Sequence, residues 1–159
     1  MNIEVRLEEL GETLPDAPKP AANYVPFVTV SNTLYVSGQV SANAEGFIRG
    51  KLGKDLTVEE GAVAAKHCAL ALLSQVRAAC DGDLERLDRV IKLTGFVNST
   101  PDFVDQPQVI NGASDFLVSV LDTQGSHARS AVSAASLPLG VAVEIEGIFA
   151  LRPQPCPQP

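Results

Sequence analysis

Apolar positions near the N-terminus recur at the spacing of an amphipathic helix. The residues on this stripe are Ile3, Leu7 and Leu10. Gly11 follows them and predicts the end of the helix. The next segment, TLPDAPKPAA, contains Pro15, Pro18 and Pro20, so it predicts an extended connector. We expect residues 1–22 to form an extension that precedes the main domain.

The middle of the chain changes from a strand pattern to a helix pattern. Residues 24–30 and 33–40 predict two strands joined by a turn at Ser31-Asn32, and Phe47-Ile48 predicts a short further strand. A helix then begins after Thr57, because Glu60 lies three residues later and completes a capping box. It ends near Cys80. Its apolar stripe consists of Val58, Ala62, Ala65, Ala69, Leu72, Leu73 and Val76.

The second half of the chain repeats this alternation. Residues 89–97 predict a strand, residues 101–121 contain a second helix, and two strands follow at 130–137 and 141–151. The apolar stripe of the second helix consists of Val109, Ile110, Ala113, Phe116, Leu117, Val120 and Leu121. The order β-β-(β)-α-β-α-β-β predicts an α+β domain over residues 23–151, with two helices on one face of a mixed six-stranded sheet. The Pro-rich tail, residues 152–159, is expected to be disordered.

The sheet face opposite the helices carries few charged residues. In the strand at 33–40, the positions assigned to this face are Tyr35, Ser37 and Gln39, and the strand at 130–137 is small on both sides. A sheet face in contact with water carries more Lys, Glu and Thr. We therefore expect this face to be buried against other copies of the chain. The alternative is that the N-terminal segment covers it, although about 20 residues are few for six strands.

Composition and charge limit the classes of partner. Charged residues make up 19% of the chain and the net charge is -7, with 12 Lys and Arg in no cluster. An acidic surface repels phosphates, so a nucleic acid is a poor partner. No apolar run reaches the roughly 20 residues that span a bilayer, and MNIEVRLEEL is acidic, unlike a signal peptide. Cys68 and Cys80 lie too far apart on one helix to form a disulfide, which favours a cytoplasmic location. No Cys/His group has metal-ligand spacing.

Three charged residues lie in the apolar closing segment: Arg129, Glu144 and Glu146. If the segment is a simple hairpin about Leu139, Glu144 pairs near Ala134, and Arg129 lies roughly 16 Å further along. The two ions cannot then meet within one hairpin, and an unpaired buried ion costs several kcal/mol. A neighbouring subunit could bring them together around a small carboxylate, which Arg binds bidentately. The alternative is that Arg129 makes an ordinary interface salt bridge and that Glu144 and Glu146 bind backbone groups or water. For Glu146 this alternative is favoured, and for Arg129 and Glu144 the spacing leaves both interpretations open.

Four motifs together resemble the reactive intermediate deaminase family (RidA, YjgF-type), formerly named endoribonuclease L-PSP or translation inhibitor. They are SGQV, IKLTGFVNS, ING and ARSAV…LP…VAVEIE, and the resemblance covers residues 24–151. It implies a chorismate mutase-like fold, with a homotrimer around a central barrel and clefts between subunits. It also implies hydrolysis of 2-imino acids or enamines to 2-keto acids and ammonia, with no cofactor and no metal.

The resemblance also assigns site residues. It implies that Arg129 holds the substrate carboxylate and that Glu144 orients the attacking water. Ser37, Gly38, Tyr24 and Asn111 match substrate-contacting positions, and Ala131 stands where many members have Cys. Simpler interpretations remain open for several of these residues: backbone capping for Ser37, a half-buried strand aromatic for Tyr24, and a helix-to-loop tie for Asn111. His127 is expected to be a solvated loop histidine.

The residues leave three functions open. An imine deaminase is the first. A trimer that binds a small carboxylate metabolite without turnover is the second, since the extension at residues 1–22 suggests a divergent subgroup. RNA cleavage or translation inhibition is the least favoured, because the chain has two histidines and no basic cluster.

Overall fold

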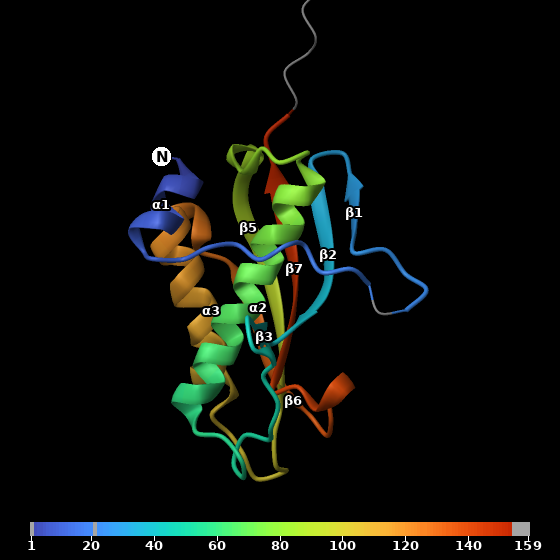
Figure 1. The fold of residues 1–159 in the computed structure, drawn as a ribbon, viewed down its shortest axis with the longest axis vertical. Helices are drawn as coiled ribbons and strands as arrows, with labels where there is room; N and C mark the ends of the chain where they lie inside the picture. Colours follow the sequence, from blue (N-terminus) through green and yellow to red (C-terminus); the bar gives the residue numbers. More distant parts are fainter. Residues whose placement is uncertain (1, 21, 154–159) are drawn as a thin grey trace, which may run out of the picture.

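The computed structural model describes residues 2–20 and 22–153, and its centre is a five-stranded mixed sheet (Figure 1). The strand order is β1-β2-β7-β5-β6. The strands are β1 (Phe27–Val30), β2 (Thr33–Val40), β5 (Leu87–Asn98), β6 (Ala128–Ala134) and β7 (Val143–Leu151). The predicted α+β class is therefore confirmed.

Two long helices cover one face of this sheet (Figure 1). They are α2 (Val58–Ala79) and α3 (Gln106–Leu121). The capping box is confirmed, since the Glu60 N–H donates to Thr57 Oγ1 at 3.2 Å and the Thr57 N–H donates to Glu60 Oε2 at 2.8 Å. Single 3₁₀ turns follow or link the longer elements: η1 (Leu84–Arg86), η2 (Asp122–Gly125) and η3 (Pro138–Gly140). No helix in the described ranges is both long and apolar enough to cross a bilayer.

The prediction of six strands in one sheet is wrong for the described residues. The additional strand pair, β3 (Ala42–Asn43) and β4 (Gly46–Phe47), forms a separate two-stranded sheet. Ala42 pairs with Phe47, and Asn43 pairs with Gly46. Because each of these strands has only two residues, they form a local hairpin and leave the main sheet with five strands.

The prediction that the last two strands form a hairpin is also wrong. Strand β5 lies between them, parallel to β6 and antiparallel to β7. Parallel neighbours require a crossover connection, and α3 provides it between β5 and β6. The chain then leaves β6 through η3, where Leu139 has a positive φ of 60°, and crosses to the other side of β5. The turn at Leu139 is correct, but it does not join paired strands.

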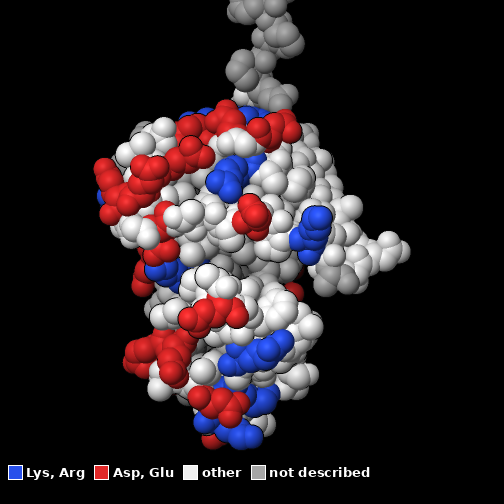
Figure 2. All heavy atoms as spheres, in the orientation of Figure 1, with Lys and Arg blue, Asp and Glu red and all other residues white. Residues whose placement is uncertain are grey.

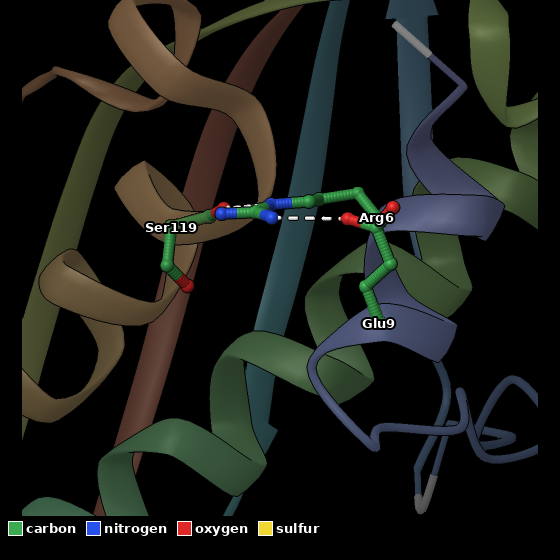
Figure 3. A network of polar contacts seen from close by, with 3 residues as sticks. All are labelled: Arg6, Glu9 and Ser119. Atoms are coloured by element: carbon green, nitrogen blue, oxygen red, sulfur yellow. Dashed lines mark hydrogen bonds and ion pairs between the residues drawn. The ribbon is translucent and has the colours of Figure 1, made fainter.

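The N-terminal extension lies against the helices (Figure 1). Helix α1 (Ile3–Glu9) buries Ile3 and Leu7. Arg6 bridges α1 and α3, because its Nε donates to the Ser119 carbonyl at 2.9 Å while its Nη1 pairs with Glu9 at 3.0 Å (Figure 3). The proposed alternative, that this segment covers the opposite sheet face, is therefore wrong for the described residues.

The uncovered sheet face carries exposed apolar side chains. The registers place Val28 beside Tyr35, and Val132 beside Phe96, on the face away from the helices. The exposed fractions are 49% for Val28, 47% for Tyr35 and 46% for Val132. Burial of this face against other copies of the chain remains a prediction.

A β-bulge in β2 reverses one predicted assignment. The pairing with β7 shifts between Val36 and Gln39, so Val36 and Gln39 both lie on the helix face. Gln39 is only 6% exposed, and its Oε1 accepts from Gln75 Nε2 at 3.4 Å. The predicted outward position of Gln39 is wrong because the bulge, at Ser37-Gly38, changes the face of every later residue in the strand.

Candidate functional site

Arg129 lies on edge strand β6 and points to the helix face of the sheet. Its partner in β5 is Leu93, which is fully buried under the helices. Arg129 Nη1 donates to Asn111 Oδ1 at 2.9 Å and to Ser114 Oγ at 3.0 Å, and its Nη2 donates to the Pro107 carbonyl at 3.4 Å. The side chain is therefore held against the first half of α3.

The acceptors around this guanidinium are all neutral. Within residues 2–20 and 22–153, Arg129 forms no ion pair with a carboxylate. Neutral acceptors orient this half-buried guanidinium but do not neutralise its positive charge. The charge is therefore available to bind an anionic ligand. Asn111, which the sequence predicted as a site residue, is thus brought into direct contact with Arg129.

His127 and Ser114 extend this hydrogen-bonded group. Ser114 Oγ lies 3.0 Å from His127 Nε2, and His127 Nδ1 lies 2.6 Å from the Gly125 carbonyl. Burial lowers the pKa of His127, the Gly125 carbonyl opposes this, and the charge of Arg129 lowers it further. A neutral imidazole that donates from Nδ1 accepts at Nε2, so Ser114 donates to His127 and accepts from Arg129.

The sequence did not predict that Ser114 and His127 form hydrogen bonds in the group around Arg129. His127 is half-buried, not the solvated loop residue that was predicted. Ser114 follows Asn111 by three residues on α3, and positions i and i+3 share a helix face. That spacing was the available signal for Ser114.

Glu144 lies on the opposite face of the sheet. It pairs with Phe96 in β5 and with Val40 in β2, and its side chain is half-buried. Burial raises the pKa of its carboxyl, and the neighbouring Glu146 raises it further. Among the described residues its carboxylate forms no ion pair. Glu144 is therefore a second ion without an oppositely charged partner in this part of the chain.

Gly38 makes room for this carboxylate. A Cβ at position 38 would lie 2.0 Å from Glu144 Oε1, a distance that no side chain can occupy. The bulge at Ser37-Gly38 therefore brings bare backbone against Glu144. Gly38 and Glu144, each predicted separately as a site residue, are therefore in close contact in the structure.

A cavity of about 660 Å³ opens beside Glu144. Gly38, Tyr24 and Glu144 all line it. Tyr24 is 48% exposed and precedes β1, so it is not the half-buried strand residue that the simpler interpretation gave. The connector and α2 form part of the wall, with Pro15, Pro18, Lys19, Pro20, His67, Leu70 and Ala71.

Ser37 and Ala131 have local roles in the structure. Ser37 Oγ donates to the Val25 carbonyl at 2.8 Å, and the Ser37 N–H donates to the Pro26 carbonyl at 2.9 Å. These bonds tie the segment before β1 to the bulge and agree with the backbone-capping interpretation of Ser37. Ala131 lies on the helix face, two residues after Arg129, and packs against the core.

Arg129 and Glu144 do not meet within the chain. Glu144 pairs with Phe96, and Arg129 pairs with Leu93, three residues away on β5. This offset corresponds to about 10 Å along the strands and about 10 Å across two strand spacings. The side chains also point to opposite faces. The predicted separation therefore holds, although the hairpin from which it was derived does not exist.

Comparisons with known proteins agree with this architecture. A family model described as "YjgF/chorismate mutase-like, putative endoribonuclease" matches residues 4–150. Protein TCP17 of Trypanosoma cruzi is 48% identical over 152 residues, which are 94% of each chain. The crystal structure of Atu1372 from Agrobacterium tumefaciens, a protein of unknown function, is 50% identical, with a TM-score of 0.87 over 94% of this chain and 92% of that one.

One relative has a name that states a reaction. A 2-iminobutanoate/2-iminopropanoate deaminase of Dermatophagoides farinae is 28% identical over 138 residues, which are 87% of this chain and 93% of that protein.

Proposed function

The chain belongs to the YjgF/chorismate mutase-like family, and from this premise we propose that it hydrolyses reactive 2-imino acids or their enamine tautomers to 2-keto acids and ammonia. The reaction takes place in clefts where Arg129 of one copy faces Glu144 of another. The relative named as a 2-iminobutanoate/2-iminopropanoate deaminase supports this choice of reaction.

The observation that carries the proposal is the pair of ions on opposite faces of one sheet. Arg129 is oriented by Asn111 and Ser114, and Glu144 is set against Gly38, yet neither has an oppositely charged partner among the described residues. Association of copies through the apolar sheet face, in a trimer, would supply each ion with the other half of a site. A small acid between them binds Arg129 through its carboxylate and presents its C=N carbon to Glu144.

Each step of the chemistry can be assigned to one of these groups. Arg129 fixes the carboxylate of the iminium form and so orients the C=N bond. Water adds to the carbon, the C=N electron pair moves to nitrogen, and Glu144 accepts the proton that water releases. Glu144 returns this proton to the amino nitrogen of the carbinolamine. The C–N bond then breaks, its electron pair leaves on nitrogen, and the hydroxyl proton passes to the departing ammonia as the C=O bond forms.

The electrostatics of Glu144 suit this double role. Burial and Glu146 raise the pKa of its carboxyl above the ordinary 4.5. A carboxylate with a raised pKa is a stronger base, and its protonated form is available to return the proton.

Complementation between two inactive variants tests the proposal. Arg129→Ala and Glu144→Gln are each expected to remove activity on 2-iminopropanoate. When the two chains are co-expressed, random assembly gives about one site in four with both native residues. Ammonia release should therefore return to about a quarter of the wild-type rate. Recovery is impossible if both residues act within one copy.

The same experiment separates the non-catalytic alternative. A binding protein would give no ammonia release above the spontaneous rate in the wild type, while a 2-keto acid would still raise its melting temperature. That result would overturn the catalytic proposal and support capture of a small carboxylate.

A further inference from the structure

The cavity beside Glu144 is larger than the simplest imino acids require. Its volume is about 660 Å³, and pockets of roughly 300–1,000 Å³ hold drug-sized ligands. Its apolar wall includes Pro18, Pro20, Phe47, Leu70, Ala71 and Leu139. A substrate of three or four carbon atoms would leave most of this space unfilled.

The N-terminal connector forms one wall of the cavity and is firmly attached. Ser74 Oγ donates to the Pro15 carbonyl at 2.9 Å, and Gln75 Nε2 donates to the Pro18 carbonyl at 2.6 Å. Ser74 and Gln75 are 1% exposed, so the connector carbonyls satisfy side chains that are buried on α2. The wall is thus an integral part of the fold.

Few charged groups face this space. The titratable side chains among the described lining residues are Lys19, Tyr24, His67 and Glu144. Lys19 comes from the connector and His67 from α2, whereas Glu144 comes from β7. The remaining wall favours an apolar substituent on the substrate. A polar substituent would lose its hydrogen bonds to water there and find few hydrogen-bond partners in the wall.

We infer that the site selects 2-imino acids with large apolar side chains, such as those derived from leucine and phenylalanine. This inference rests on the proposed function. The carboxylate lies on Arg129 of a second copy and the reacting carbon faces Glu144, which lines the cavity. The substituent on that carbon then extends into the space between the connector and α2.

Competition against a chemical trap measures this preference. An L-amino acid oxidase generates imino acids from alanine, leucine and phenylalanine, and semicarbazide captures what the protein does not hydrolyse. We expect kcat/KM for the leucine- and phenylalanine-derived imino acids to exceed that for the alanine-derived one by about tenfold or more, since added methylenes in an apolar pocket discriminate on this scale.

Two substitutions in the cavity wall should weaken the preference for large apolar side chains. Ala71→Leu places a larger side chain in the cavity wall. Phe47→Ala removes an aromatic that is 43% exposed, so we expect the fold to tolerate its loss. Each should lower the ratio of leucine-derived to alanine-derived rates by about fivefold or more. Ala78→Leu makes the same change as Ala71→Leu at an exposed position of α2 outside the cavity, and it should leave the ratio unchanged.

The outcomes distinguish this inference from the proposed function. Equal or faster hydrolysis of the alanine-derived imino acid overturns the inference and leaves the reaction intact. If no imino acid is hydrolysed, the reaction is wrong, and calorimetry decides the inference. Tighter binding of 4-methyl-2-oxopentanoate than of pyruvate then supports an apolar pocket, and equal binding overturns it.

Discussion

The two halves of the proposed site are built by different means. Around Arg129, side chains do the positioning: Asn111 and Ser114 on α3 hold the guanidinium, and His127 holds Ser114. Around Glu144, the backbone positions the ion. A bulge brings Gly38 against the carboxylate, and a proline-rich connector forms the nearby wall. The first half should therefore be sensitive to hydrogen-bonding groups, and the second to side-chain volume.

Glu144→Gln is expected to have the largest effect on rate. It keeps the volume of the side chain and removes the base, and loss of a general base costs about 10²–10⁴-fold in kcat. The substitution is measured as ammonia release from 2-iminopropanoate, at saturating and at limiting substrate.

Glu146→Gln is the matched control for Glu144→Gln. It should keep most of the rate at neutral pH. Because the charge of Glu146 raises the pKa of Glu144, its removal should move the acid limb of the kcat/KM profile to lower pH. In the wild type this limb lies above pH 4.5, since the ordinary pKa is raised. A limb that does not move would show that Glu144 is not the titrating base.

Arg129→Ala should have the second-largest effect on rate, with a loss of about 2–5 kcal/mol in transition-state stabilisation. The partner anion is then left without its cation, so KM should rise as well as kcat fall. Arg89→Ala is the control, because Arg89 lies on β5, is exposed, and among the described residues donates one long hydrogen bond, from Nη2 to the Ser126 carbonyl at 3.5 Å. Full activity in Arg129→Ala would overturn the role of the first half-site.

Gly38→Ala tests whether the second half depends on volume. The new Cβ would overlap Glu144 Oε1, so the carboxylate must move, and a displacement of about 1 Å costs about 10²-fold in rate. Combining Gly38→Ala with Glu144→Gln should add little, since residues that act as a unit are not additive. Additive losses would show that Gly38 acts through something other than Glu144.

Ser114→Ala should have the smallest effect. It removes one of the three hydrogen bonds that Arg129 donates within the described part of the chain. Such a bond is worth about 0.5–1.5 kcal/mol, and its loss should appear mainly in KM. Ser119→Ala is the control on the same helix, because within residues 2–20 and 22–153 the Ser119 hydroxyl donates to the Phe116 carbonyl and has no contact with Arg129.

The pH dependence of KM provides a second test of the role of Ser114. The pKa of His127 is lowered, so its neutral form, which accepts from Ser114, persists below pH 6.5. Once the imidazole is protonated, Nε2 becomes a donor, so the hydrogen bond to Ser114 must reverse and the Ser114 hydroxyl must reorient beside Arg129. KM of the wild type should therefore rise as pH falls through this lowered pKa. The rise in KM should be absent in Ser114→Ala. If the rise persists in that variant, His127 does not act on Arg129 through Ser114.

Much of the fold was predictable because local patterns specify it. All seven apolar positions assigned to α3 are buried, from Val109 to Leu121. The capping box fixed the start of α2 at Val58, and β2 has the predicted bounds. Arg129 and Glu144 were also predicted as candidate site residues, because an ion in an apolar strand is costly without a partner. Gly38 was predicted only through the match of its SGQV motif to the family.

The sequence by itself therefore determined which segments are helices or strands, where the caps lie and which ions lack a local reason. Only the tertiary structure decided that β5 separates β6 from β7, that a bulge reverses Gln39, and that Arg129 and Glu144 face opposite sides of the sheet. The physical reason is that helical stripes and caps depend on residues within a few positions of one another. Strand order, register and facing depend on hydrogen bonds between distant segments, where a shift of one residue exchanges the two faces.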